Sequence, residues 1–441
     1  MIKKLFSSQL RINMVSGVVT TVVNVVVLAI AYPVYLHFLG YETYGMWLIL
    51  AAVLTLAQLG NLGISSAVMK LVAEEYGRRN TKGIQSYVTT ALGILLVTGS
   101  LALILILLFQ NQIISAFKLS GRNAVIASRF LPYIGALSVY VMLTQAINST
   151  LSGLGRMDLA NYIQSSGRII TVSISVILLW LGNNIESLLI GNVFSYVFVG
   201  AASYFFIRRI ADISLLRLRN INSQSFRRLL RFGSGVFGSS VASMLLSPFN
   251  KLMLARYAGI SSIPIYEIAF TGSMQVRALI ETGLRALMPE ISRIGANMTG
   301  YAKDKISQIY RRAMKLIFLF GIPMYGGIII LLTPLLKFWL RQRYVDELPI
   351  AFRIMLISTF VSLLSVPSYY TLLGLGMVRY TLTSHIILSG VSALIILTIV
   401  FIWHSISVET VSWTVLTATA VTTLYLTRQN KRRVLKERMK L

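Results

Sequence analysis

Seven ionisable residues lie within or at the edge of long apolar segments, where a charge needs a physical reason. Five are basic and two are acidic: Arg129, Lys251, Glu267, Arg277, Glu281, Arg285 and Arg353. A charge at the centre of a membrane helix costs about 2.5 to 3.5 kcal/mol on insertion scales, so such residues usually face protein, water or a ligand. Basic groups held out of bulk water suit a diphosphate, because Arg offers a planar pair of donors and Lys a compact charge.

Four of these residues share one apolar segment, 263–290. At roughly 100° per residue, Glu267 and Arg285 have the same azimuth, with Glu281 about 40° and Arg277 about 80° away. This charged face cannot be covered by lipid. Either Arg277, Glu281 and Arg285 pair with one another at four-residue steps and only compensate charge, or the face lines a cavity. The cavity interpretation makes the basic residues Arg129, Lys251, Arg277, Arg285 and Arg353 candidates for diphosphate binding. It makes Glu267 and Glu281 candidates for coupling to protons or sodium.

The elements that must hold these residues are apolar helices. Of the 441 residues, 56% are hydrophobic and 12% are charged, whereas soluble domains carry about 25% charged residues. Apolar runs recur along the whole chain, each long enough to cross a hydrocarbon core of roughly 30 Å. We therefore predict an all-α polytopic membrane protein of about 12 transmembrane helices. The predicted spans are residues 13–37, 44–68, 84–108, 129–152, 163–181, 187–207, 232–255, 263–290, 315–336, 350–373, 381–403 and 408–427.

Lys and Arg concentrate before the first span, in alternate loops and in the tail, whereas the other loops hold few. The positive-inside rule then places both termini in the cytoplasm. An Arg-rich cytoplasmic connector, residues 208–231, separates six predicted spans in residues 1–207 from six in residues 232–427, and residues 428–441 form a basic cytoplasmic tail. The net charge of +27 is explained by this orientation and by attraction to anionic headgroups, and we expect no nucleic-acid partner.

The two halves carry short matching motifs about 220 residues apart. Gly153-Leu-Gly155 matches Gly374-Leu-Gly376, and Ser16-Gly-Val18 matches Ser234-Gly-Val236. With six spans in each half, both halves have the same orientation, which indicates a parallel repeat about an axis along the membrane normal.

Small polar residues also recur every four positions. Ser16, Thr20 and Asn24 do so in the first span, and Gly235, Ser239, Ser243 and Ser247 in the seventh. Such stripes favour close helix packing, although a polar stripe facing a hydrated cavity would have the same pattern.

Several kinds of chemistry lack the residues they need. The chain has no cysteine, which removes thiolate metal sites and cysteine nucleophiles. Its three histidines, His37, His385 and His404, show no ligand spacing, and no Gly-rich phosphate loop precedes a Lys-Ser or Lys-Thr pair. We expect no metal, no cofactor and no direct use of ATP, so any transport must be coupled to gradients.

Three stretches resemble the O-antigen flippase family of the multidrug/oligosaccharidyl-lipid/polysaccharide exporter superfamily. They are Phe38–Trp47, Leu59–Gly63 and Ser152–Asn161, and the similarity extends through Pro289–Ser292. The resemblance implies two six-helix bundles around a central cavity. It also implies alternating access that moves a polyprenyl-diphosphate-linked oligosaccharide, an O-antigen or related repeat unit of lipopolysaccharide, to the outer leaflet of a bacterial inner membrane. A polysaccharide polymerase and chain-length proteins are then expected partners.

Two alternatives stay open. A small-molecule or drug antiporter of the same superfamily would need unpaired intramembrane carboxylates, whereas basic residues are in excess here. A membrane polysaccharide polymerase or ligase would need catalytic groups on its external loops, and those loops are short, with few carboxylates, chiefly Glu42, Glu186, Asp346, Glu347 and Glu409. We therefore expect a transporter and not an enzyme.

Overall fold

The computed structural model describes residues 8–211, 222–284 and 300–435, together with Leu287, Ile291 and Ile294. All regular secondary structure in these ranges is helical and comprises fourteen α-helices. Helices satisfy every backbone N–H internally, which a lipid environment requires. By length and apolar composition, eight helical stretches of the described residues are able to cross a membrane. The prediction of an all-α membrane protein is confirmed.

The chain divides into two compact units, residues up to Met244 and residues from Leu245, so the boundary falls inside one long helix, α8 (Ser223–Tyr257). Besides the first part of α8, the first unit contains α1 (Ser8–Ala57), α2 (Ile64–Gly77), α3 (Thr81–Leu108), α4 (Gln110–Ala116), α5 (Gly121–Gly153), α6 (Met157–Trp180) and α7 (Glu186–Ala211). The second contains α9 (Ser262–Leu284), α11 (Gly300–Leu316), α12 (Ile322–Leu340), α13 (Glu347–Gly374), α14 (Val378–Trp403) and α15 (Val408–Asn430). Short 3-10 or π segments are η2 (Gln58–Asn61), η4 (Ile317–Gly321), η5 (Arg341–Arg343) and η6 (Lys431–Leu435).

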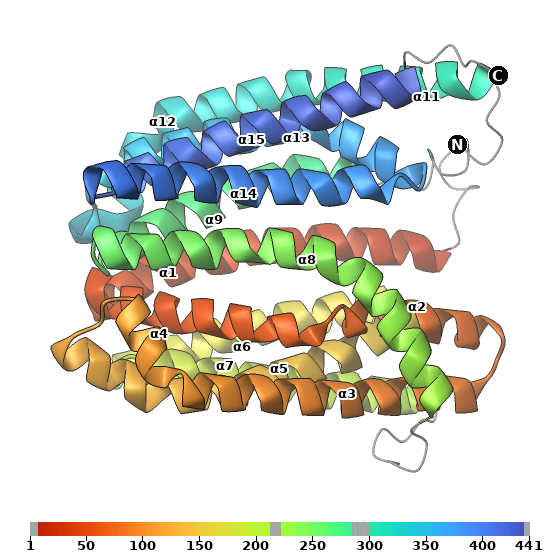
Figure 1. Cartoon of the computed structure of the whole chain (residues 1–441), viewed down its shortest axis with the longest axis horizontal. Helices are drawn as coiled ribbons and strands as arrows, with labels where there is room; N and C mark the ends of the chain where they lie inside the picture. The colour runs from red at the N-terminus through yellow and green to blue at the C-terminus, as the bar shows by residue number, and fades with distance from the viewer. Residues whose placement is uncertain are drawn as a thin grey trace. The chain divides into compact units, whose positions relative to one another are not determined.

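Helix α5 is the centre of the first unit. It packs against α1, α2, α3, α6 and α7 (Figure 1). Of its apolar span, 56% is buried, against 17–33% in the six less enclosed spans. Its buried residues include Gly135, Ser138 and Ala146, and such small residues allow neighbouring helices to approach closely.

Two glycine positions interrupt the first hairpin of this unit. Helix α1 breaks at Gly40, whose φ is 69° and ψ is 177°, so it is two helices joined at a kink. Gly63, with φ 73°, begins α2 after the short η2 segment. A Cβ atom at Gly63 would lie 2.5 Å from the carbonyl oxygen of Gly233 on α8. Only glycine fits this close approach, which ties the start of α2 to the first part of α8.

Helix α13 has the corresponding role in the second unit. It packs against α9, α11, α12, α14 and α15 (Figure 1), and 61% of its span is buried. The ends of α5 and α13 also have the same conformation. Gly155 and Gly376 both have left-handed φ angles, 80° and 75°, and their N–H groups donate to the carbonyls of Ser152 and Leu373 at 3.1 and 3.0 Å. The sequence match of the two halves therefore extends to the backbone of these turns.

The predicted cytoplasmic connector and tail lie only partly within the described residues. Residues 212–221 and 436–441 lie outside them. The beginning of the connector extends α7 to Ala211, and its end, from Ser223, begins α8.

Candidate functional site

The second unit contains a buried ion pair between Lys251 on α8 and Glu267 on α9. The Nζ and Oε2 atoms are 2.8 Å apart, and the two side chains are 9% and 16% exposed. Thr271 donates a hydrogen bond to the other oxygen of Glu267 at 3.0 Å. Next to the pair, the amide of Asn250 donates to the Tyr266 hydroxyl at 2.9 Å. Removing either charged partner would leave an uncompensated charge with little access to water.

A second pair lies farther along α9. Arg277 Nε is 3.2 Å from Glu281 Oε2, with the two side chains 22% and 19% exposed. The hydroxyl of Tyr370, on α13, donates to the other Glu281 oxygen at 3.1 Å. This carboxylate is therefore fixed from two helices, and Arg277 is held by it.

The two pairs are separate sites on one helix. Ten positions separate Glu267 from Arg277, which corresponds to about 15 Å along α9 at 1.5 Å per residue. The four-residue spacing of Arg277 and Glu281 indicated their pair, but nothing in the spacing along α9 could indicate Lys251 as the partner of Glu267, because Lys251 belongs to the preceding helix.

The remaining candidates have other surroundings. Arg353, on α13, donates to the hydroxyl of Thr333 on α12 at 2.8 Å. Arg129 lies on α5 in the first unit and is exposed. Arg285 lies outside the described residues. Within the second unit, the structure thus joins Lys251 to Glu267 and Arg277 to Glu281, and it gives Arg353 a neutral partner.

A cavity of about 450 Å³ lies among α1, α5, α6 and α7 of the first unit. Its lining includes five carboxamide side chains, from Asn24, Gln145, Asn148, Gln164 and Asn192, together with the aromatic residues Tyr35, Trp47 and Tyr196. Among the described residues that line it, Arg168 on α6 is the one that is charged. Sequence reasoning missed Arg168, although it lies in the predicted span 163–181 and the cost of inserting a charge would have identified it.

The polar stripe of α1 combines both interpretations that its spacing left open. Ser16 accepts a hydrogen bond from the Asn161 amide at 3.0 Å, and Thr20 accepts one from Ser165 at 3.0 Å. These two residues therefore pack α1 against α6, while Asn24, one turn further, lines the cavity. The side chains of Gly235, Ser239 and Ser243 in the second stripe lie outside the described residues.

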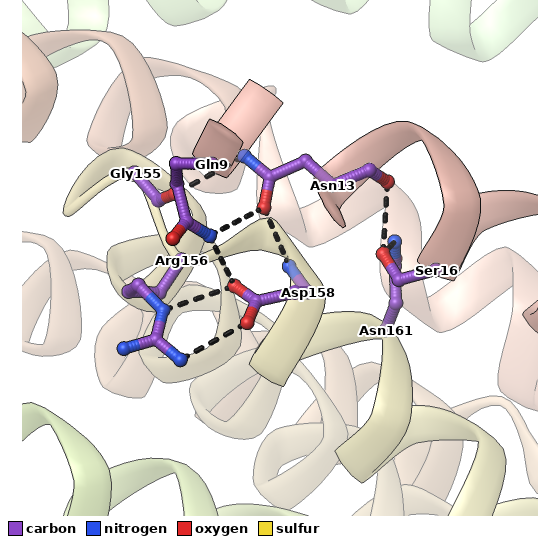
Figure 2. Close-up of polar contacts among 7 residues, drawn as sticks. All are labelled: Gln9, Asn13, Ser16, Gly155, Arg156, Asp158 and Asn161. Atoms are coloured by element: carbon purple, nitrogen blue, oxygen red, sulfur yellow. Dashed lines mark hydrogen bonds and ion pairs between the residues drawn. The ribbon is translucent and has the colours of Figure 1, made fainter. Parts of the chain in front are cut away.

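A polar network fixes the beginning of α1 to the turn between α5 and α6 (Figure 2). Asp158 is 5% exposed and accepts hydrogen bonds from Arg156 and from the Gln9 amide, at 3.0 Å each. Asn13 donates to the Gly155 carbonyl at 3.1 Å and accepts from the Asp158 backbone N–H at 3.1 Å. The hydrogen bonds to Asp158 raise the pKa of the Arg156 guanidinium above its usual value.

A second pocket of the first unit, about 550 Å³, has mixed charge. Arg122 and Arg129 line it together with Glu42 and Glu186, and Asn123 donates to Glu42 Oε1 at 2.8 Å. Both carboxylates come from connecting segments or helix starts, so this pocket lies near one end of the helices.

Among the described residues, no group of three His, Cys, Asp or Glu side chains is placed to hold a metal ion. His385 contacts the ring of Tyr369 at 6.0 Å between centroids, which is a packing contact.

Comparisons with known proteins give a family and a fold. A family model described as "Polysaccharide biosynthesis protein" matches residues 12–295. No curated protein sequence matches the chain. Among solved structures, an inward-facing multidrug resistance MATE transporter of the MOP superfamily matches with TM-score 0.73 and 14% identity, covering 98% of this chain and 95% of that one.

Two further structures are similar over almost their whole length. A Vibrio cholerae MATE transporter variant matches with TM-score 0.69 and 13% identity, covering 98% of this chain and 97% of that one. A Pyrococcus furiosus MOP superfamily transporter matches with TM-score 0.67 and 16% identity, covering 96% and 95%. The latter is described as having a binding pocket of reversed polarity that suggests a different function. At these identities, the likeness establishes the fold alone.

Proposed function

Because this chain belongs to the polysaccharide biosynthesis family, within the multidrug/oligosaccharidyl-lipid/polysaccharide exporter superfamily, we propose that it is a flippase for a polyprenyl-diphosphate-linked oligosaccharide. The superfamily consists of transporters, so the chain is a multi-pass membrane transporter and not an enzyme. We propose that its cargo is an O-antigen or related repeat unit, which it moves from the inner to the outer leaflet of a bacterial cytoplasmic membrane by alternating access.

The observation that carries this proposal is the two ion pairs whose carboxylates lie on α9, with their cations on α8 and α9. Lys251 and Arg277 are each held against one carboxylate, with little exposed surface. A diphosphate headgroup competes with a carboxylate for the same donors, because both are oxygen anions that accept charge-assisted hydrogen bonds. The Glu267 and Glu281 carboxylates thus satisfy the cations while the site is empty and yield them when the headgroup arrives.

Competition between the carboxylates and the diphosphate keeps the affinity of the sites for the headgroup moderate. An anion held by unopposed arginines would leave slowly, whereas a carboxylate returning to its partner assists release. Because about 15 Å of helix separates the two pairs, the headgroup meets them one after the other. We propose that Glu267 and Glu281, as the competing carboxylates, also couple this exchange to protons or sodium.

The membrane potential supplies a driving force for the headgroup. Moving one charge through 100 mV is worth about 2.3 kcal/mol, so a diphosphate with about two negative charges gains roughly 4 to 5 kcal/mol on leaving an inside-negative cell. The lipid tail remains in the bilayer beside the protein.

We further propose twelve crossings with both termini in the cytoplasm. The two arms of α1 on either side of Gly40 count as two crossings, and α8, α9 and α15 cross in addition to the other apolar stretches. Helices α8 and α9 carry charged side chains, of which Lys251 and Glu267 contact each other within the protein, and α15 is rich in threonine. A lipid-linked oligosaccharide, a polysaccharide polymerase and chain-length proteins are the proposed partners.

A small-molecule or drug antiporter is the second candidate, since several similar folds belong to multidrug transporters. The charge of the sites argues against a cationic drug. Every described carboxylate of α9 is already paired with a Lys or Arg, and Arg353 donates to the neutral hydroxyl of Thr333.

The test uses purified protein in vesicles with a fluorescent lipid-linked oligosaccharide and an imposed inside-negative potential. We expect flipping by the wild type, at least a tenfold slower rate for Arg277→Gln, and a nearly unchanged maximal rate with altered pH dependence for Glu281→Gln. Lys82→Gln, which removes an exposed charge at the start of α3, is the matched control.

Absence of flipping by the wild type under all potentials and pH gradients would refute the flippase. A flipping rate that is unaffected when the potential is collapsed at constant pH would refute the electrophoretic contribution alone. A wild-type flipping rate in Arg277→Gln would show that the pair of Arg277 and Glu281 does not take part in transport.

A further inference from the structure

The cavity of the first unit differs in chemistry from the paired sites of α9. We propose that it is a carbohydrate-binding subsite that takes an acidic sugar residue of the oligosaccharide, with Arg168 binding the sugar carboxylate. This inference rests on the proposed function and names a chemical class for its cargo.

Besides aliphatic residues, the lining contains groups that hydrogen-bond to hydroxyls. Four helices contribute carboxamides, a group with both donors and an acceptor. Two of the five are partly used within the protein, because Gln145 bonds to Gln58 and Asn61, and the Asn148 amide donates to Ala160 and Ser203. Sugar hydroxyls need both kinds of partner, because each is a donor and an acceptor at once. Side chains that only donate, such as Lys or Arg, can bond the oxygen of a hydroxyl but leave its hydrogen without an acceptor.

Several of these groups lack a protein partner. The buried Oδ1 of Asn24 and Oγ1 of Thr144 have no hydrogen-bond partner among the described residues. Asn192 uses its amide N–H to bond the Leu188 carbonyl at 2.8 Å, which leaves its oxygen for another donor. Unsatisfied polar atoms of this kind are costly unless water or a ligand meets them, and hydroxyl groups supply the donors that the oxygens of Asn24 and Thr144 lack.

Aromatic side chains complete the wall. Tyr35 and Trp47 on α1 and Tyr196 on α7 line the same cavity, and Trp47 is 8% exposed. Aromatic rings present apolar faces beside polar groups, which matches the mixed surface of a sugar ring. The volume of about 450 Å³ lies within the usual range of ligand pockets, roughly 300 to 1,000 Å³, and accommodates part of an oligosaccharide.

Arg168 is the only charged residue in the described lining. None of the ion pairs among the described residues includes it, in contrast to Lys251 and Arg277. Its planar fork matches one carboxylate by two parallel hydrogen bonds. A diphosphate carries about two negative charges and would need further cations, which this lining does not offer. A uronic acid or another sugar with one carboxylate satisfies both Arg168 and the carboxamides.

The experiment measures binding of two soluble disaccharides to the full chain in lipid nanodiscs by saturation-transfer NMR and calorimetry. An aldobiouronic acid, a disaccharide of one uronic acid and one neutral sugar, is the acidic probe and maltose the neutral one. We expect the wild type to bind the acidic disaccharide about tenfold more tightly than maltose, because one charge-assisted pair accounts for at least that ratio. Arg168→Gln should bind both disaccharides with the weaker, neutral affinity, and Arg168→Lys should restore part of the preference.

Two further variants separate the sugar site from a general anion site. Asn192→Leu should lower the affinity for both disaccharides about equally, because it removes a carboxamide and leaves Arg168 in place. Lys82→Gln, an exposed charge of the same unit, should leave both affinities unchanged. Farnesyl diphosphate serves as a probe for the diphosphate headgroup, and its affinity should be the same in the wild type and in Arg168→Gln.

Equal affinity of the wild type for the two disaccharides, a preference that survives Arg168→Gln, or no binding of either disaccharide overturns the proposal. A tenfold loss of farnesyl diphosphate binding in Arg168→Gln also overturns it, because Arg168 would then hold the headgroup. The vesicle assay distinguishes failure of the subsite proposal from failure of the flippase proposal. If only the subsite proposal is wrong, the wild type still flips the lipid-linked oligosaccharide and Arg168→Gln flips it at the same rate.

Discussion

The two units treat intramembrane charge in opposite ways. In the second unit, Lys251 and Arg277 are each paired with a carboxylate of α9 at 2.8 and 3.2 Å. In the first, Arg168 lines an open cavity with uncharged neighbours, and the ion pair of Arg156 with the buried Asp158 lies at the turn between two helices, with the Arg156 side chain 37% exposed. A paired charge is part of the fold, whereas an unpaired one in a cavity depends on water or on a ligand.

We infer from this difference that the buried pairs contribute mainly to the stability of the fold and that Arg168 contributes mainly to ligand binding. Loss of one partner from a buried pair leaves a charge that the protein cannot solvate. Loss of Arg168 leaves only neutral groups that can bond to water. Mutations at the two kinds of site each remove one charge. They should nevertheless lower the free energy of unfolding by very different amounts, more at a buried pair than at Arg168.

The largest effect is expected at the buried pair. Lys251→Met should lower the free energy of unfolding by about 3–5 kcal/mol, because Glu267 keeps its charge with little water contact. The double variant Lys251→Met/Glu267→Gln should recover most of the loss. Denaturant unfolding of the purified protein in detergent measures both.

The matched control is Lys70→Met, since Lys70 and Glu74 form an exposed pair at 3.8 Å with side chains 50% and 42% exposed. Such a pair contributes less than about 1 kcal/mol. A double variant as unstable as Lys251→Met alone would show that packing of the Lys251 side chain, and not its charge, stabilises the unit.

An intermediate effect is expected at the polar network of Figure 2. Asp158→Asn removes the charge that Arg156 and Gln9 bond, and a hydrogen bond to a charged group contributes about 1.5–3 kcal/mol. We expect a loss of this size and faster amide hydrogen exchange at the beginning of α1.

Gln9→Ala removes one shared donor to Asp158 and Asn13 but leaves the ion pair of Arg156 with Asp158, so it should cost less than Asp158→Asn, about 0.5–1.5 kcal/mol. Unchanged exchange at the start of α1 in Asp158→Asn would mean that other contacts, such as Ser16 with Asn161, are sufficient to hold this helix.

The smallest effect on stability is expected at Arg168. Arg168→Gln should change the free energy of unfolding by less than about 0.5 kcal/mol, as for an exposed residue outside any network, although we expect it to abolish the preference for an acidic sugar. Thermal unfolding beside the disaccharide binding assay tests both parts. A large loss of stability would indicate that Arg168 is a structural partner within the unit and that the contrast between the units is wrong.

The sequence by itself determined the class of protein and identified most of the charged residues of the candidate sites. Apolar runs long enough to cross the membrane specify helices, because no other single-chain segment satisfies its backbone in lipid. The cost of a charge in such a run drew attention to Lys251, Glu267, Arg277 and Glu281 before any contact was known. Four-residue spacing sufficed for Arg277 with Glu281, since both lie on one helix.

Only the tertiary structure decided which charges meet across helices and where a cavity forms. The pair of Lys251 and Glu267 joins two helices, and Asn24, Arg168 and Asn192 come to one cavity from three. Periodicity reports the azimuth of a residue on its own helix, but it contains no information about the rotation of the neighbouring helix. The same limit explains α1, where Thr20 contacts Ser165 of α6 and Asn24 lines the cavity although both belong to one stripe. The spacing along α1 does not show at which turn the neighbouring helices leave a cavity.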